Sequence, residues 1–182
     1  YANSVIGIAP TPANRATPKL YRYDKHHLVP FGEFIPFGFR WFVDMMNIPL
    51  GDFGRGDALQ APFSVKDQWV LPNICYEDLF GEEIAGQLRA SDAAGSPVAT
   101  LLLNVSNIAW FGDSIALPQH LQISQMRALE TGRPMLRSTN TGATAIIAPD
   151  GKVVAQLKPF ERGVLTLSLI HISEPTRQAE IS

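Results

Sequence analysis

A single cysteine stands at a position where it could act as a nucleophile. Cys75 lies between a segment expected to be a buried strand, residues 72–75, and a segment expected to be a helix, residues 77–90. The free N–H groups at the start of a helix lower the pKa of a thiol from its usual value of about 8.5 and can hold an oxyanion. Cys75 is therefore a candidate for covalent catalysis, although a lone cysteine at a strand end is more often a small buried apolar residue.

A lysine and a glutamate earlier in the chain suit the same chemistry. Lys25 lies near the end of an expected strand, residues 19–29, and Glu33 follows in the next loop. A lysine held near a reacting carbonyl stabilises the oxyanion of a tetrahedral intermediate, and a neighbouring carboxylate orients the lysine or moves protons. The alternative is an ordinary surface lysine that forms a weak ion pair with a loop glutamate.

The elements that would carry these residues alternate between strands and helices. Further strands are expected over residues 1–10, 98–104, 135–138, 142–149, 152–157 and 163–167, and residues 62–65 and 68–71 are expected to form a hairpin. A second helix is expected over residues 118–131, where an apolar stripe ends at the stop signal Gly132. This alternation indicates α/β layers packed face to face.

Aromatic side chains crowd the segment that follows Lys25. Six of them lie within twelve positions, and prolines and glycines interrupt them: Phe31, Phe34, Phe37, Phe39, Trp41 and Phe42. The interruptions predict a loop rather than a long helix. Such a loop either folds onto its own core or presents a surface to lipid or to an acyl chain.

Composition and charge exclude several other classes of protein. The chain has 182 residues, enough for about one domain, and its 15 Lys and Arg against 17 Asp and Glu give a formal net charge of −2. With no charge run, a nucleic-acid partner is disfavoured. Adjacent His26 and His27 would point to opposite faces of a strand, which disfavours a metal site, and the glycines of residues 51–56 indicate a turn rather than a phosphate-binding loop.

Four motifs, in this order, resemble those of the bacterial apolipoprotein N-acyltransferases, which are membrane members of the nitrilase superfamily. They are residues 23–33 (YDKHHLVPFGE), 75–78 (CYED), 107–112 (NIAWFG) and 125–130 (QMRALE), and residues 133–142 (RPMLRSTNTG) fit as well. The resemblance runs from residue 1 to about residue 167. It implies an α/β fold that is part of a nitrilase-like αββα sandwich, and a Glu-Lys-Cys triad.

Carried over residue by residue, the resemblance implies that Cys75 takes an acyl chain from a phospholipid as a thioester. The acyl chain would then pass to the α-amine of a lipid-modified cysteine at the N-terminus of an apolipoprotein. Lys25 would stabilise the tetrahedral intermediates and Glu33 would support the site. The implied substrate-binding residues are Asn3, Phe34, Tyr76, Glu77, Asn107 and Trp110. No cofactor or metal is implied, and the implied location is the bacterial inner membrane, with the catalytic domain facing the periplasm and the membrane surface.

The chain departs from the family pattern in three places. The general-base Glu of the triad belongs to a strand upstream of this chain, and the membrane-spanning helices of the family are missing. We therefore expect residues 1–167 to be the C-terminal part of a catalytic domain, truncated at the N-terminus and inactive by itself. Ile108 stands where the family usually has Asp, and we expect it to point at apolar surface. Residues 168–182 (SLIHISEPTRQAEIS) resemble translated adapter read-through, so a non-native tail is expected there.

Two other functions stay open at this point. The first is a soluble nitrilase-type amidase, which would hydrolyse the thioester with water, and the second is a non-catalytic module on the same fold. The aromatic segment favours the acyltransferase, because a hydrolase of small polar substrates has little use for so many aromatic side chains beside its lysine. The reactivity of the Cys75 thiol separates the catalytic functions from the non-catalytic module.

Overall fold

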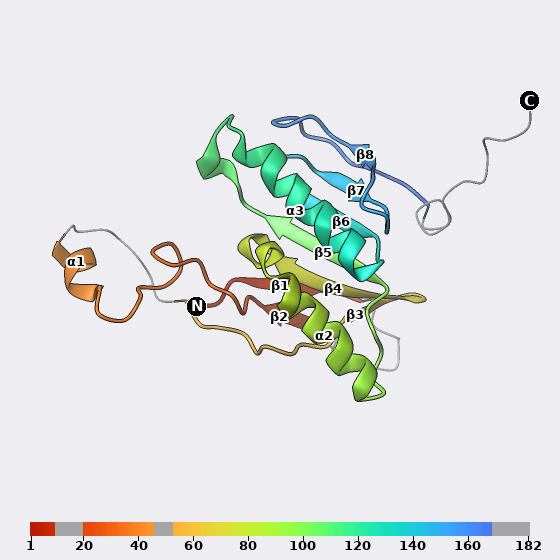
Figure 1. The fold of residues 1–182 in the computed structure, drawn as a ribbon, viewed down its shortest axis with the longest axis horizontal. Helices are drawn as coiled ribbons and strands as arrows, with labels where there is room; N and C mark the ends of the chain where they lie inside the picture. Colours follow the sequence, from red (N-terminus) through yellow and green to blue (C-terminus); the bar gives the residue numbers. More distant parts are fainter. Residues whose placement is uncertain (10–19, 46–52, 169–182) are drawn as a thin grey trace, which may run out of the picture.

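A computed structural model describes residues 1–9, 20–45 and 53–168 of the chain (Figure 1). Their elements, in chain order, are β1 (Ser4–Gly7), β2 (Tyr21–Asp24), α1 (Arg40–Met45), β3 (Phe63–Val65), β4 (Gln68–Ile74), the 3-10 helix η1 (Cys75–Leu79), α2 (Gly81–Ala93), β5 (Leu101–Ser106), the 3-10 helix η2 (Ala109–Phe111), α3 (Ala116–Thr131), β6 (Met135–Thr139), β7 (Ala145–Ile147) and β8 (Val153–Gln156).

A six-stranded sheet with the order β3-β4-β5-β6-β7-β8 forms the centre of the molecule. Its three inner strands β4, β5 and β6 are parallel, and the remaining pairs are antiparallel. The inner strands are rich in buried apolar residues, as strands covered on both faces must be. Because parallel strands end at the same edge of a sheet, the loops after β4, β5 and β6 meet there, and Cys75 opens the first of them.

Helices α2 and α3 cover one face of this sheet (Figure 1). The core between them contains Leu71, Leu102 and Met135 from the sheet, together with Ile84 from α2 and Ala128 from α3. The expected helical stripe is confirmed, since Leu117, Leu121, Ser124 and Ala128 are the buried residues of α3. Gly132 ends the helix in the left-handed conformation that glycine adopts without strain.

The antiparallel β1–β2 ribbon lies against the opposite face of the sheet. An apolar cavity of about 530 Å³ separates the two, and it is lined by Val5 and Ile8 from the ribbon side and by Val70, Leu101 and Leu103 from the sheet. The arrangement is thus a helix layer, a sheet and the beginning of a second sheet. These are three of the four layers of an αββα sandwich.

Most expected strands and the second helix are confirmed, whereas three expectations are wrong. The strand over residues 19–29 ends at Asp24, because Lys25 to Val29 turn inward to bond other segments. No strand forms over residues 163–167 of the described chain. Val164 is 87% exposed there, and no neighbouring strand supplies the backbone hydrogen bonds that a strand needs. The helix expected over residues 77–90 is replaced by η1 and, after a break at Phe80, by α2.

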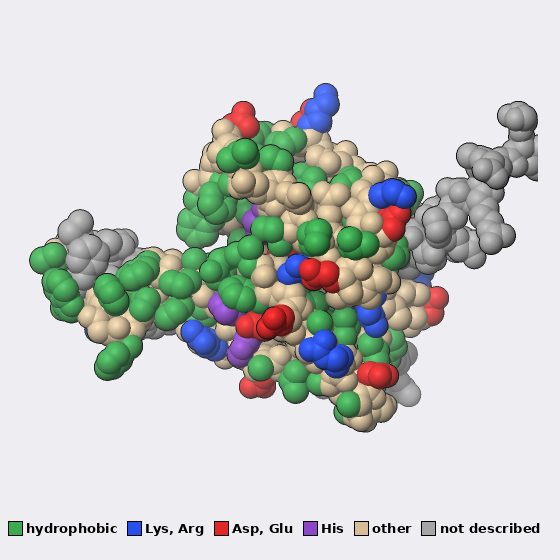
Figure 2. Space-filling model, viewed as in Figure 1, with side chains coloured by type: hydrophobic (Ala, Val, Ile, Leu, Met, Phe, Trp, Pro, Cys, Tyr) green, Lys and Arg blue, Asp and Glu red, His purple; other side chains and the backbone are tan. Residues whose placement is uncertain are grey.

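The aromatic segment projects from the body as an arm that ends in α1 (Figure 1). Figure 2 shows hydrophobic side chains gathered along this arm, and five of its apolar residues are exposed: Phe31, Phe37, Phe39, Trp41 and Met45. The loop expected there is confirmed up to residue 39, while its folding onto the core is wrong for these side chains. Among the described residues, no helix has the length and apolar character needed to cross a membrane.

Candidate active site

Cys75 is half-buried at the first residue of η1, directly after β4. Its φ of 53° lies in the left-handed region, which residues with a Cβ rarely adopt. Strained backbone of this kind persists only where the surroundings fix it, and it gathers at functional sites. The expectation that Cys75 directly precedes a long helix over residues 77–90 is wrong, since Cys75 opens the five-residue η1 and α2 begins only at Gly81.

A buried ion pair joins the two other residues that the sequence singled out. Lys25 Nζ lies 2.6 Å from Glu33 Oε2, and the Lys25 side chain is 1% exposed. Glu33 also accepts hydrogen bonds from the backbone N–H of Val29 and from Asn3 Nδ2, at 2.9 and 3.0 Å. The alternative of a weak surface ion pair is therefore wrong. Burial raises the pKa of Glu33, but the bonds from Lys25, Val29 and Asn3 outweigh it and hold that pKa below its ordinary value.

Cys75, Lys25 and Glu33 line one open pocket of about 600 Å³ at the carboxyl edge of the parallel strands. Its other polar lining residues are Asn3, Ser106, Asn107, Trp110, Ser138, Thr139 and Asn140. Three of the six predicted substrate-binding residues, Asn3, Asn107 and Trp110, thus reach the pocket, while Phe34, Tyr76 and Glu77 do not line it. A larger cavity, of about 900 Å³, lies beside β2 and β3 and contains neither Cys75 nor Lys25.

Burial has the largest effect on the pKa of the Cys75 thiol. It raises the pKa of Cys75 above the ordinary value, although the Lys25 ammonium, a hydrogen bond with Ser106 and one with the Tyr76 backbone act in the opposite direction. The net shift is therefore opposite to the one expected from a helix N-terminus. Since only the thiolate is a strong nucleophile, the thiol needs a base in order to react.

Glu77 lies in the layer beneath the pocket and is 4% exposed. Its Oε1 accepts the backbone N–H groups of His26 and His27, at 2.7 and 3.1 Å. Its Oε2 accepts the Ile74 N–H at 2.7 Å and the Tyr23 hydroxyl at 3.0 Å. Glu77 therefore joins the segment that carries Lys25 to the strand end that carries Cys75, which is a structural position that the motif alone did not indicate.

Tyr76 and Phe34 do not line the pocket and instead contact neighbouring side chains. The Tyr76 ring lies edge-on to His27 and to Phe80, with ring centroids 5.7 and 5.2 Å apart. The guanidinium carbon of Arg55 sits 5.1 Å from the centroid of the Phe34 ring, within the range of a cation–π contact.

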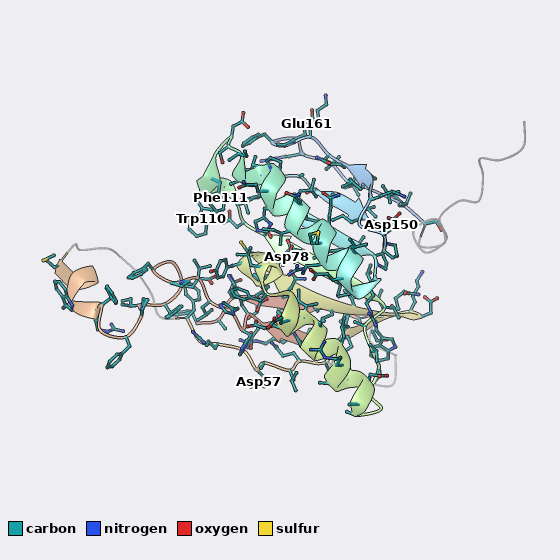
Figure 3. The ribbon with its side chains drawn as sticks, viewed as in Figure 1. Asp57, Asp78, Trp110, Phe111, Asp150 and Glu161 are labelled. Carbon is teal, nitrogen blue, oxygen red and sulfur yellow. The ribbon has the colours of Figure 1, made fainter. Side chains whose placement is uncertain are left out.

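The loops after β5 and β6 are bonded to each other across the pocket. Asn140 Nδ2 donates to Asn107 Oδ1 at 2.6 Å, and Asn140 Oδ1 accepts the Ile108 N–H at 3.1 Å. Ile108 is fully buried, and its Cδ1 would lie 2.1 Å from a Cβ placed on Gly142, so a side chain at residue 142 would displace the end of Ile108. Trp110 Nε1 donates to the Asn107 carbonyl at 2.8 Å, and Figure 3 shows Trp110 and Phe111 beyond the end of β5.

Several residues around the site were missed at the level of sequence. Asn140, Ser138 and Thr139 belong to a motif that matched the family but carried no assigned role. Asp78 and Arg137 are both almost completely buried, at 0% and 2% exposure. An arginine inside an apolar strand is the signal that could have drawn attention to this pair, because a charge is buried only where a partner compensates it.

Comparison with known proteins gives a consistent result. The profile of the carbon-nitrogen hydrolase family matches residues 2–172. An apolipoprotein N-acyltransferase of Ralstonia nicotianae is 64% identical over 165 residues, which make up 91% of this chain and 30% of the relative. One of Verminephrobacter eiseniae is 58% identical over 165 residues, or 91% of this chain and 29% of the relative. The chain thus spans about 30% of the length of these curated relatives.

The fold has solved counterparts as well. A carbon-nitrogen hydrolase from Helicobacter pylori superposes with a TM-score of 0.56 at 15% identity, over 78% of this chain and 50% of that one. Nit3 of Saccharomyces cerevisiae, described as a member of the nitrilase superfamily, gives 0.53 at 16% identity, over 78% and 45%. The α/β fold of the nitrilase superfamily is therefore confirmed.

Proposed function

The chain belongs to the carbon-nitrogen hydrolase family, and on that premise we propose that its pocket is the acyl-transfer centre of an apolipoprotein N-acyltransferase. The observation that carries the proposal is the presence of Cys75 beside the buried Lys25–Glu33 pair in one pocket. The identity of 64% and 58% to two proteins of that name supports it over an amidase.

In the first half-reaction, Cys75 Sγ forms a bond to the carbonyl carbon of a phospholipid ester. The carbonyl oxygen becomes an oxyanion, and the Lys25 ammonium, held by Glu33 at 2.6 Å, stabilises it. The bond from the carbonyl carbon to the glycerol oxygen then breaks. The proton that left the thiol ends on the departing hydroxyl, and the acyl chain stays on Cys75 as a thioester.

In the second half-reaction, the α-amine of a lipid-modified N-terminal cysteine on an apolipoprotein attacks the thioester carbonyl. The C–S bond breaks, the amine loses a proton, and the Cys75 thiol is restored. Both half-reactions need a general base, and the pKa of Cys75 is raised by burial. We assign that role to a glutamate upstream of Tyr1, in the part of the protein that this chain does not include.

Polar and aromatic side chains around the pocket are assigned to substrate binding. Asn3, Asn107 and Trp110 line it and can contact the lipid headgroup or the peptide. Phe34, which follows Glu33 in the chain, is assigned an apolar contact with the acyl chain. Tyr76 and Glu77 act on substrate through the segments that they hold, since neither lines the pocket.

The domain organisation follows from the same proposal. Residues 1–167 form the C-terminal part of the catalytic domain, and residues 168–182 are a non-native tail, which lies outside the described residues apart from Ser168. A long sequencing read through the native locus tests both statements. A strand-borne glutamate and apolar spans upstream, with a different continuation after Leu167, would support them, and a short upstream segment without such spans would contradict them.

The exposed aromatic arm is assigned to the membrane surface, at the periplasmic side of the bacterial inner membrane. Replacing Phe37 and Trp41 by serine in the full-length protein is expected to raise the KM for phospholipid about tenfold with little change in kcat, because burying aromatic rings in the interface favours lipid capture. Phe160→Ser, at a residue that is also exposed but outside the arm, is the matched control. An unchanged KM would contradict the assignment.

A trapped intermediate tests the proposed function directly. The full-length protein is incubated with a phospholipid that carries an alkyne-tagged acyl chain, without acceptor, and the tagged peptide is identified by mass spectrometry. The label is expected on Cys75, released by neutral hydroxylamine and absent from Cys75→Ala, and addition of a diacylglyceryl-cysteine peptide should move it to the peptide amine. Release of free fatty acid in place of transfer would support the amidase, and an unlabelled Cys75 would contradict both enzymes.

A further inference from the structure

The mechanism above makes no use of two charges buried next to the nucleophile. Asp78, in η1, and Arg137, in β6, are 0% and 2% exposed, and Figure 3 shows Asp78 in the interior beside α3. Asp78 belongs to the same 3-10 helix as Cys75. Contacts that fix the Asp78 carboxylate therefore also fix the short helix whose first residue is the strained Cys75.

Arg137 binds three separate elements through its guanidinium. Its Nη1 donates to Ser124 Oγ and lies against His120 Nδ1 in α3, both at 2.7 Å, and its Nε donates to the Ala143 carbonyl at 3.1 Å. Its Nη1 also lies 3.8 Å from Asp78 Oδ2, and the Ser124 hydroxyl donates to that same oxygen. Ser124 thus bridges the two charges and fixes η1 to α3 and β6.

The charges in this cluster are well defined by their surroundings. Burial raises the pKa of Asp78 to about 6, so its carboxylate is ionised at neutral pH. Burial and the Arg137 charge lower the pKa of His120 to about 4, so the imidazole is neutral and its Nδ1 accepts from Arg137. Burial lowers the pKa of Arg137, while attraction by Asp78 and by Cys75 raises it. The Arg137 charge therefore lies within electrostatic range of Cys75.

A purely stabilising ion pair is a poor account of this arrangement. Among the described residues, Asp78 Oδ1 and Arg137 Nη2 have no hydrogen-bond partner although both are buried. A buried ion pair that is incompletely satisfied contributes little net stability, and apolar residues of similar size are often as stable. What an apolar pair could not supply is a fixed positive charge beside the 3-10 helix that begins at Cys75.

We propose that Arg137 is a positioning residue for the acyl-transfer reaction. From inside the core it holds η1 through Ser124 and Asp78. Its positive charge, which the Asp78 carboxylate partly offsets, favours the Cys75 thiolate. The inference rests on the proposed role of Cys75. The other charges that face this cluster are Arg127 in α3 and Glu77 in η1, while Lys25 and Glu33 face Cys75 from the pocket side. Lys25 meets the reacting carbonyl, whereas Arg137 acts on the sulfur through the protein.

The pH dependence of Cys75 alkylation tests the proposal in the full-length protein, without lipid. Iodoacetamide reacts with the thiolate, so the rate rises through a midpoint that reports the Cys75 titration. Asp78→Asn removes the negative charge and keeps the shape, and it is expected to lower the midpoint by about one pH unit, which is on the order of the effect of one charge several ångströms away at an effective dielectric constant of about 20. Arg137→Gln is expected to raise the midpoint by a similar amount.

A structural role alone would slow alkylation in both variants without moving the midpoint in opposite directions. An unmoved or raised midpoint in Asp78→Asn that still melts cooperatively would overturn the proposal, and if only one variant folds, the direction of its shift decides. Asp150→Asn, which removes an exposed carboxylate paired with Lys152, should leave the midpoint unchanged. Acyl transfer by Cys75→Ala would refute the proposed function instead, and it leaves the alkylation result of the other variants standing.

Discussion

Replacing Lys25 by methionine in the full-length protein is expected to lower kcat for acyl transfer by about 10²–10³-fold, the usual loss when one oxyanion donor is removed from an acyl-transfer site. The Lys25 side chain is 1% exposed and lies in the same pocket as Cys75, where its charge is screened less than at the surface. The binding of phospholipid should change much less, because the loss falls on the transition state. Single-turnover kinetics with a tagged phospholipid measures both quantities.

The same substitution leaves the Glu33 carboxylate without its cation, and a buried charge that loses its partner costs about 3–5 kcal/mol. The double variant Lys25→Met/Glu33→Gln removes both charges and should recover most of the thermal stability while kcat stays low. Because the pKa of Glu33 is lowered in the fold, the stability it contributes is present at neutral pH and is lost only as the pH falls through that lowered value. Recovery of kcat in the double variant would mean that Lys25 serves the fold rather than the chemistry.

The elements of this chain could be predicted from sequence where one local signal decided the structure. The apolar stripe of α3 and its glycine stop gave a helix that begins within two residues of its expected start and ends where expected. Asp150 and Gly151 predicted the β7–β8 hairpin, and a continuous apolar run predicted β5 near the centre of the sheet. Lys25 and Glu33 are close in sequence, so a contact between them needed only the loop that residues 29–33 form.

The interior of the site depends on contacts between distant parts of the chain, which periodicity does not encode. The break between η1 and α2 is one case. Arg127, from α3, donates to the carbonyls of Asp78 and Leu79, and its guanidinium fills the space where a Cβ on Gly81 would stand. The local sequence pattern over residues 77–90 does not include Arg127, and therefore it predicted one continuous helix. Arg137 and Asp78 are a second case, since their pairing requires α3 to bring Ser124 between them.

Glu77 joins the segment that carries Lys25 to the strand end that carries Cys75. Its substitution is therefore expected to have a large effect on both stability and kcat. Glu77→Ala leaves four donors without this acceptor, namely the buried Ile74 N–H and Tyr23 hydroxyl and the partly buried backbone N–H groups of His26 and His27. Each such group costs about 1–3 kcal/mol, so this variant is expected to lose several kcal/mol and to accumulate poorly. Glu77→Gln is the informative variant.

A glutamine at this position keeps one carbonyl oxygen for two of the donors and turns an amide NH₂ toward the other two. Its best orientation places the NH₂ toward Tyr23 and Ile74, because a hydroxyl can turn and accept whereas a backbone N–H cannot. One unsatisfied N–H is then left at Ile74, directly before Cys75, which costs about 1–3 kcal/mol. A shift of about 1 Å between catalytic groups can cost on the order of 10²-fold in rate, so kcat is expected to fall by about that factor.

The matched control for Glu77→Gln is Glu83→Gln. Glu83 is also acidic, and from α2 its Oε1 lies 2.9 Å from the Nδ1 atom of His27. Its side chain, however, is 38% exposed and does not bridge backbone groups of the two catalytic segments. Glu83→Gln should change kcat by less than about threefold, because an exposed ion pair contributes little free energy. Comparison of kcat with the thermal midpoint separates the two effects, since Glu77→Gln should lose far more rate than its modest loss of stability explains. Full kcat in Glu77→Gln would show that the joint between the Lys25 and Cys75 segments is not what aligns the site.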